Sequence, residues 1–234
     1  MKLTLLKICS MALLLSPLFA TAQENTAGAK RPRRAYLSTG MDGYILSTSI
    51  LQKNGGDAKL TTPRFTGFFH IGLNVNFDFS NHSGFYTGIN IKNIGFIEKY
   101  NNPDSTVKRR VYTFGIPLGF KFGNIKEGNY FLVGGGVDFP FNFKEKGFIK
   151  RSEKAKFNEW FSDRTPAVMP YVFIGAHFRP MFSFKLQYYP VNFLNTDYST
   201  TPAGATAPVY PYRGYKTQLV MATFAFDINF RPRD

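Results

Sequence analysis

The chain has 234 residues, which suits one domain once an N-terminal segment is set aside, and its formal net charge at pH 7 is +14. Aromatic residues make up 17% of the sequence, including 26 phenylalanines, yet the mean hydropathy is slightly negative. This composition excludes a bundle of transmembrane helices, because no segment beyond residue 22 approaches 18 uninterrupted apolar residues. It favours long strands in which apolar and polar side chains alternate.

Residues 1–22 have the pattern of a secretory signal peptide. Two lysines precede an apolar run, and Ala20-Thr21-Ala22 has the small-x-small form of a cleavage site. We therefore expect Gln23 to be the mature N-terminus. The only cysteine, Cys9, falls inside this segment, so the mature chain should contain no disulfide and no cysteine-based metal site.

Residues 23–34 form a polar leader that ends in the basic run from Lys30 to Arg34, and we expect it to be flexible. Loss of Lys2 and Lys7 with the signal lowers the net charge of +14 by two. A secreted chain is a poor candidate for binding nucleic acid. Two explanations of the charge stay open: contact with outer-membrane lipid headgroups or lipopolysaccharide, or the solubility of exposed loops.

The first expected strand spans residues 35–51 and alternates only weakly. We assign Leu37, Met41 and Ile45 to one face, and Asp42 and Tyr44 to the other. A polar loop over residues 52–63 then leads to the second strand, residues 65–79.

The second strand is the clearest element in the sequence. Every second residue from Phe65 to Phe79 is apolar or glycine, and the residues between them are mostly polar, among them His70 and Asp78. A period of two over this length indicates a β-strand with one apolar face. Its fifteen residues would span about 50 Å, whereas a tilted strand needs about 9–11 residues to cross a bilayer.

Six further alternating segments follow. They cover residues 85–92, 112–122, 131–141, 168–178, 182–188 and 220–230, and the connections between them include residues 98–108, 123–129, 144–166, 179–180 and 190–214. Counted from the first strand, the connections run long, short, long, short, long, short, long. Short turns at one end and long loops at the other are typical of outer-membrane barrels. The sequence therefore predicts an all-β fold, an eight-stranded antiparallel up-and-down transmembrane β-barrel over residues 35–230, with a tail at 231–234.

Alternation alone does not say which face points outward. A soluble barrel of the lipocalin type would point its apolar face inward, but here that face is crowded with Phe and Ile, too bulky for every strand to place inside eight strands. The other face carries glycines and charges of both signs, which can pair within a narrow lumen. We therefore expect a structural polar network that fills the lumen and leaves no solute channel. Its members are Arg64, His70, Asp78, Lys92, Lys121, Asp138, Arg179, Lys185 and Asp227.

Three segments give the chain a resemblance to a known family. They are Ser83 to Ile89 (SGFYTGI), Thr113 to Lys121 (TFGIPLGFK) and Val133 to Gly136 (VGGG). With them the chain resembles the OmpX/OmpA-type eight-stranded barrels and, more closely, the PorT-like outer-membrane β-barrel family common in Bacteroidetes. A glutamine directly after the cleavage site also fits. The chain departs from many membrane barrels in one respect, because Arg231-Pro232-Arg233-Asp234 follows Phe230 where an aromatic residue often ends the chain.

The resemblance implies an integral protein in the outer membrane of a Gram-negative bacterium, inserted by the outer-membrane assembly machinery. Some relatives serve in protein secretion, so secretion-system components are candidate partners. We expect a non-enzymatic barrel whose long loops contact a partner, and the candidate contacts are Phe157, Trp160, Phe161, Tyr198, Tyr210 and Tyr212. The same aromatic residues could instead lie at the membrane interface.

A lipid-modifying enzyme built on a small barrel is the alternative function. Such chemistry needs a nucleophile with a positioned base, and we expect no histidine to lie beside a serine and an acid on one face. We also predict no cofactor and no metal, because the sequence contains no phosphate-binding loop, dinucleotide fingerprint or metal-site motif.

Overall fold

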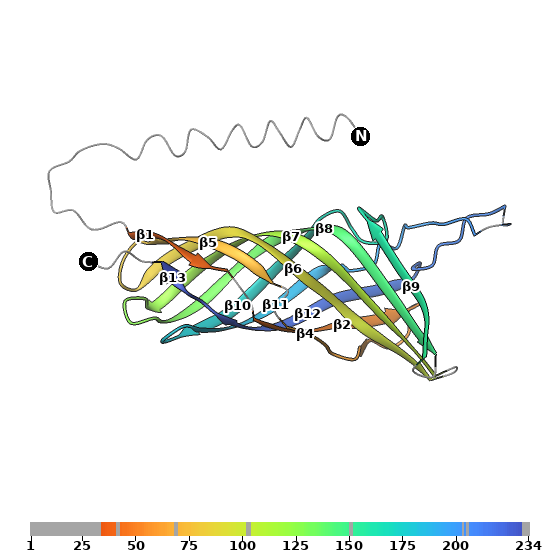
Figure 1. The fold of residues 1–234 in the computed structure, drawn as a ribbon, viewed down its shortest axis with the longest axis horizontal. Coiled ribbons are helices and arrows are strands. Elements are labelled where there is room, and N and C mark those ends of the chain that lie inside the picture. The colour runs from red at the N-terminus through yellow and green to blue at the C-terminus, as the bar shows by residue number, and fades with distance from the viewer. Residues whose placement is uncertain are drawn as a thin grey trace, which may run out of the picture. The chain divides into compact units, whose positions relative to one another are not determined.

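The computed structural model describes residues 34–40, 43–67, 70–101, 104–149, 152–202, 204 and 206–230. Within that part of the chain every regular element is a β-strand (Figure 1). It contains no helix long and apolar enough to span a membrane. The expected signal peptide, residues 23–33 of the leader and the tail at 231–234 lie outside the described residues, so these assignments stay predictions.

The described strands belong to one antiparallel sheet. Their bounds are β1 Arg34–Thr39, β2 Tyr44–Lys53, β3 Lys59–Leu60, β4 Arg64–Gly67, β5 Ile71–Asp78, β6 Ser83–Asn101, β7 Asp104–Asn124, β8 Asn129–Ile149, β9 Ser152–Trp160, β10 Met169–Phe178, β11 Phe182–Asn192, β12 Tyr215–Phe226 and β13 Asn229–Phe230. Hydrogen-bonded neighbours run in the order β13-β1-β5-β6-β7-β8-β10-β11-β12-β2-β3, with β4 beside β2 and β9 beside β8.

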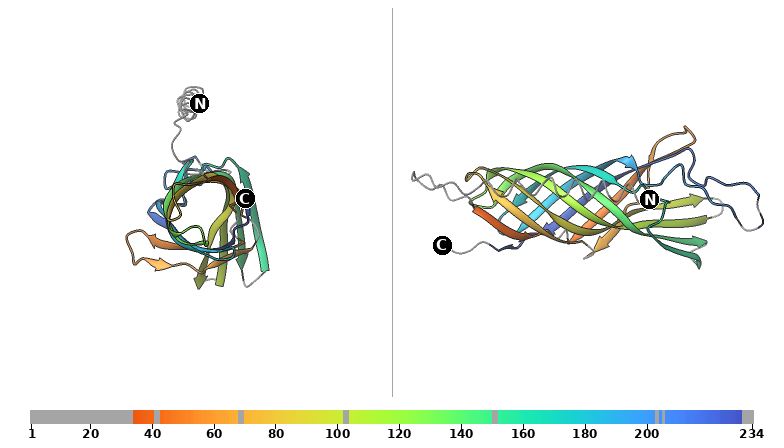
Figure 2. Two further views of the ribbon diagram at one scale, coloured as in Figure 1. Left: turned by 90° about the vertical axis from the view of Figure 1, so that its left-hand side faces the viewer. Right: turned by 90° about the horizontal axis from the view of Figure 1, so that it is seen from above.

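The sheet curls into a barrel, as the view along its long axis shows (Figure 2). Three of the eight expected strands are interrupted: the first is β1 with β2, the second is β4 with β5, and the last is β12 with β13. The path of hydrogen-bonded strands therefore runs from β13 to β3 and does not close. When the interrupted strands are counted as the eight expected ones, however, the first strand pairs with both the second and the last. Its β1 part pairs with β5 and β13, and its β2 part pairs with β4 and β12. The eight-stranded antiparallel architecture is confirmed.

The two ends of the barrel differ. Three short connections, residues 79–82, 125–128 and 179–181, lie at the end where β1 begins and β13 ends, which we term the turn end. The opposite end, the loop end, carries the long connections. This arrangement follows from the alternation of short and long connections in the sequence.

Apolar side chains on the barrel wall point outward. On β7, Phe114, Ile116 and Leu118 are exposed, whereas the residues that alternate with them along the strand, from Thr113 to Lys121, are buried. The same alternation continues on the neighbouring strands. The exposed apolar residues of the wall, which we term the apolar belt, include Leu46, Phe65, Ile71, Leu73, Ile89, Ile91, Phe120, Phe122, Phe131, Val133, Phe139, Val172, Ile174, Phe178, Phe184, Leu186, Phe224 and Phe226.

Two expected loops are wrong. Residues 98–108 continue as strand, since β6 ends at Asn101 and β7 begins at Asp104, and much of residues 144–166 is strand as well. Pairing between β7 and β8 runs on to Ser105 opposite Ile149, and β9 then pairs with β8. These strands could not be recognised from the sequence because they carry polar side chains on both faces. They lie beyond the apolar belt, so alternate residues no longer divide into an apolar set and a polar set. We term residues 93–101, 104–112, 142–149 and β9 the protruding sheet; it extends beyond the ring at the loop end (Figure 2).

The face assignment of the first strand is also wrong in part. Leu37 points outward, but Ile45 is buried, and Tyr44 and Leu46 are exposed. The alternation changes phase between β1 and β2, across residues 40–43. Met41 and Asp42, assigned to opposite faces from the sequence, lie outside the described residues.

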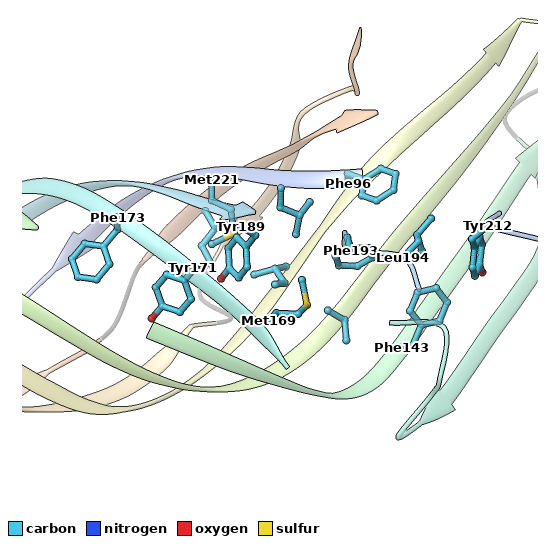
Figure 3. Packing of buried hydrophobic residues seen from close by; sticks show 14 of the residues in the cluster. Phe96, Phe143, Met169, Tyr171, Phe173, Tyr189, Phe193, Leu194, Tyr212 and Met221 are labelled. Atoms are coloured by element: carbon cyan, nitrogen blue, oxygen red, sulfur yellow. The ribbon is translucent and has the colours of Figure 1, made fainter. Parts of the chain in front are cut away.

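The lumen holds an apolar core as well as charged groups. Figure 3 shows buried side chains that continue from Phe173 and Tyr171 to Phe143 and Tyr212. The residues after β11 contribute to it, because Phe193 and Leu194 are fully buried. The expectation of a wholly polar interior is therefore wrong for the loop-end half of the barrel.

Two glycines make room for rings that cross the lumen. Gly119 of β7 lies opposite Gly134 of β8. A Cβ atom on Gly119 would stand 2.3 Å from the ring of Tyr86, and one on Gly134 would stand 2.7 Å from the ring of Phe173. The two rings lie with centroids 6.3 Å apart and fill the barrel at this level.

Candidate functional site

One buried ion pair near the turn end joins β7 to β5. The Lys121 ammonium contacts the Asp78 carboxylate and donates to the Asn76 amide oxygen and the Tyr36 hydroxyl, each at 3.2 Å. Lys121 is 0% exposed. A buried ammonium needs such a shell, because its charge has been removed from water.

A second ion pair lies deeper in the barrel. Lys92 Nζ is 2.8 Å from Asp138 Oδ2, and the Tyr189 hydroxyl donates to the same oxygen at 2.6 Å. Lys92 also donates to the Tyr189 oxygen at 3.1 Å and stands 4.0 Å from the centroid of the Tyr171 ring. The two pairs hold β5, β6, β7, β8 and β11 in one register.

The other expected lumen residues are less uniform. Arg64 donates to the Asn93 side-chain oxygen at 2.6 Å, and His70 and Lys185 line a cavity of about 20 Å³ that could hold about one water. Asp227 is only partly buried. Arg179 is misplaced by the sequence reasoning: it is exposed in the turn after β10, where its backbone N–H donates to Asn129.

One expectation about enzymatic groups is wrong. His177 lies directly opposite Ser183 on β11, and its Nε2 is 3.9 Å from Asp227 Oδ2, so a histidine does lie near a serine and an acid. Sequence spacing could not reveal this, since the three residues come from β10, β11 and the end of β12. However, His177 Nδ1 contacts the Gly128 carbonyl at 2.7 Å. A triad needs one ring nitrogen for the serine and the other for the acid, and this histidine has its second nitrogen engaged with the backbone.

A charged cluster inside the protruding sheet was missed from the sequence. Glu98 contacts the Lys53 ammonium and accepts from Arg109 Nη1 at 2.6 Å, while Arg109 Nε donates to Glu145 at 2.7 Å. Burial alone would raise the pKa of Glu98, but the hydrogen bond from Lys53 and the charge of Arg109 outweigh it and lower that pKa. No regular spacing of charges marks this cluster in the sequence, because Glu98, Arg109 and Glu145 come together through the pairing of β6, β7 and β8.

The six aromatic contact candidates fall into two groups. Trp160 and Phe161 are 62% and 79% exposed, and Phe157 and Tyr210 are partly exposed. Tyr212 is 4% exposed and accepts a hydrogen bond from Arg164 at 3.1 Å, and the Tyr198 ring lies tilted against its ring with centroids 5.8 Å apart. Tyr212 therefore belongs to the core, and its prediction as a partner-contact residue is wrong. Tyr198 packs against it. Phe157 and Trp160 belong to strand β9 rather than to a loop.

No metal-ligating cluster of three or more His, Cys, Asp or Glu side chains occurs among the described residues. The described barrel combines buried ion pairs and an apolar core inside, an apolar outer surface and a polar loop end.

Comparisons with known proteins give a likeness of low score. No protein-family model and no curated protein sequence matches the chain. Among solved structures, the attachment invasion locus protein Ail of Yersinia pestis is 16% identical, with a TM-score of 0.31, and the alignment covers 83% of this chain and 97% of Ail. Neisserial surface protein A is 8% identical, with a TM-score of 0.40, covering 84% of this chain and 97% of that protein. Both are small outer-membrane β-barrel proteins, and values of this size establish no family for the chain.

Proposed function

We propose that this chain is an integral, non-enzymatic β-barrel of the Gram-negative outer membrane, with the turn end in the periplasm and the loop end outside. The apolar belt is the observation that carries the proposal. Soluble monomers rarely expose a contiguous apolar patch beyond a few hundred Å², and apolar surface left in water costs roughly 25 cal/mol per Å². A belt of Phe, Ile, Leu and Val around the wall is stable if hydrocarbon surrounds it.

Aromatic residues at the loop-end edge of the belt support this orientation. Tyr112, Phe141 and Trp160 form a row across β7, β8 and β9, with ring centroids 6.2 and 5.9 Å apart. Membrane barrels carry such aromatic girdles at the level of the headgroups. Short turns toward the periplasm and longer structures outside are the usual topology.

The filled lumen argues for a role on the outer surface rather than in transport. Both ion pairs and the apolar core occupy the interior, so the accessible groups are Trp160, Phe161, Tyr210 and the protruding sheet. We propose that this end contacts an extracellular or membrane partner. The sequence resemblance alone supports three further proposals: membership of the PorT-like family, an accessory role in protein secretion, and insertion by the assembly machinery. Cleavage after Ala22 is proposed from the signal-peptide pattern of residues 1–22.

Fractionation tests the proposal directly. The full chain, expressed with its N-terminal segment in a Gram-negative host, should sediment with outer membranes, resist extraction by alkaline carbonate and dissolve only in detergent. Its electrophoretic mobility should change on heating, as a folded barrel opens. Recovery in the soluble periplasm without detergent would overturn the membrane assignment. An altered lipid A pattern that disappears in His70→Ala and His177→Ala variants would overturn the non-enzymatic assignment.

A further inference from the structure

Charges on the protruding sheet are sorted by face. Residues directly opposite each other in an antiparallel pair point to the same side, and the register places Lys108 opposite Lys146 and Arg110 opposite Lys144. Strand β9 adds Lys156 opposite Lys146. We term these five residues the basic ladder. The residues between them, Arg109 and Glu145, lie on the other face and pair with each other there.

Four of the five residues of the basic ladder are not neutralised within the described structure. Among the described residues, Lys108, Arg110, Lys144 and Lys146 form no ion pair with an acidic side chain. Two of the four contact aromatic rings: Lys108 Nζ lies 5.1 Å from the Phe148 ring centroid, and Lys144 Nζ lies 5.2 Å from that of Tyr112. Like charges directly opposite each other destabilise a sheet. A surface that served solubility alone would mix the two signs, so this pattern calls for an anion from outside the chain.

The position of the basic ladder identifies the anion. Along β7 the outward residues run from Phe114 in the apolar belt to Tyr112 in the aromatic row, and then to Arg110 and Lys108. Successive outward residues lie about 7 Å apart along a strand, and the usual tilt of membrane-barrel strands reduces this to about 5 Å in height. The polar region of each leaflet is roughly 5–8 Å thick. Arg110 and Lys144 then stand at headgroup level, and Lys108, Lys146 and Lys156 stand just beyond it.

We propose that the basic ladder binds the phosphate groups of lipopolysaccharide in the outer leaflet, whose acyl chains lie against the apolar belt on β7 and β8. This inference rests on the proposed outer-membrane location. A phospholipid phosphate would reach only the row nearer the membrane, whereas a phosphorylated sugar headgroup extends to both rows. Continuity of the basic ladder with the aromatic row and the apolar belt favours a lipid over a soluble polyanion.

The test compares two variants of the full chain with equal loss of charge. One changes the ladder through Lys108→Gln, Arg110→Gln, Lys144→Gln and Lys146→Gln. The matched control changes four exposed bases elsewhere through Lys59→Gln, Lys126→Gln, Arg179→Gln and Arg213→Gln. Each purified protein is placed in phosphatidylethanolamine–phosphatidylglycerol vesicles with and without lipopolysaccharide, and bound lipopolysaccharide is measured after separation of the protein in mild detergent.

We expect the ladder variant to retain at least tenfold less lipopolysaccharide than the unaltered chain, and the control to retain it within about twofold. Lipid A from which the phosphates have been removed should bind the unaltered chain as weakly as lipopolysaccharide binds the ladder variant. Equal losses in both variants, or no loss in the ladder variant, would contradict the proposal. So would tighter binding of a soluble sulfated polysaccharide than of lipopolysaccharide. Heat-modifiable mobility and outer-membrane fractionation of both variants keep this outcome separate from failure of the membrane assignment.

Discussion

At the scale of single residues, buried ion pairs specify how the strands of the barrel align. Lys121 and Lys92 are enclosed, and each is held by a carboxylate and a tyrosine oxygen, with the Asn76 amide oxygen as a further acceptor for Lys121. Removing one partner from such a pair leaves an uncompensated buried charge, which costs far more than removing both. These residues therefore act on register and stability rather than on chemistry.

Lys121→Met should lower the free energy of unfolding by about 3–5 kcal/mol, because Asp78 would lose its cation in a closed interior. The double variant Lys121→Met with Asp78→Asn should recover part of this loss. Urea unfolding in detergent micelles or vesicles, followed by tryptophan fluorescence of Trp160 and by heat-modifiable mobility, gives both values. Equal destabilisation of the single and double variants would show that the pair contributes through packing and not through the compensation of charge.

The stability of the fold at acidic pH should depend on Glu98, which lies in the protruding sheet outside the membrane. Its folded-state pKa is lowered, so ionised Glu98 stabilises the fold above the ordinary carboxyl pKa, and this stability is lost as pH falls through the folded value. Glu98→Gln should be less stable than the unaltered chain at pH 7, and the difference should shrink at pH 3. Melting temperatures at the two pH values measure this. A difference that grows in acid would contradict the lowered pKa.

At the scale of the strand, period-two alternation decides which side chains meet lipid. Leu118 and Val209 are a matched pair for testing it, because their side chains are 47% and 49% exposed, one in the apolar belt and the other in the coil between β11 and β12. In water the two sites would be equivalent. In a bilayer they are not.

Leu118→Arg should destabilise the folded barrel in vesicles by roughly 2–4 kcal/mol, the cost of a cation on the lipid face near the midplane. Val209→Arg should change stability by less than about 0.5 kcal/mol, as exposed surface substitutions do. Reversible unfolding from phosphatidylcholine vesicles gives the comparison. Equal effects of the two substitutions would mean that the apolar belt does not face hydrocarbon.

At the scale of the whole molecule, side chains fill much of the interior of the barrel. Ion pairs occupy its middle and turn-end half, and an apolar core that includes Phe96, Phe193 and Leu194 occupies the loop-end half. An eight-stranded barrel is only wide enough for side chains to fill. The protein should therefore separate two compartments without connecting them.

Planar bilayers containing the purified protein should show no steady conductance above that of lipid alone, because no continuous water path crosses two layers of paired charges and a layer of packed rings. Liposomes containing it should not swell in isotonic arabinose. The same protein, denatured by heating and added at equal concentration, is the control for leakage caused by contaminating protein. Reproducible unitary currents from the native protein alone would contradict a filled lumen.

Local alternation and turn residues such as those at 79–84 were enough to predict the eight strands, the short turns between them and the outward face of most strands. Contacts that depend on the register between distant segments became visible only in the three-dimensional fold. The sequence pattern failed where alternation stops marking burial: the protruding sheet is paired strand although its residues suggested loops, and Tyr212, expected to contact a partner, is packed in the core. Likewise His177, Ser183 and Asp227 meet only because β10, β11 and β12 are neighbours. The rows of bases on β7, β8 and β9 have the same origin, since a one-residue slip between these strands would turn every side chain to the other face.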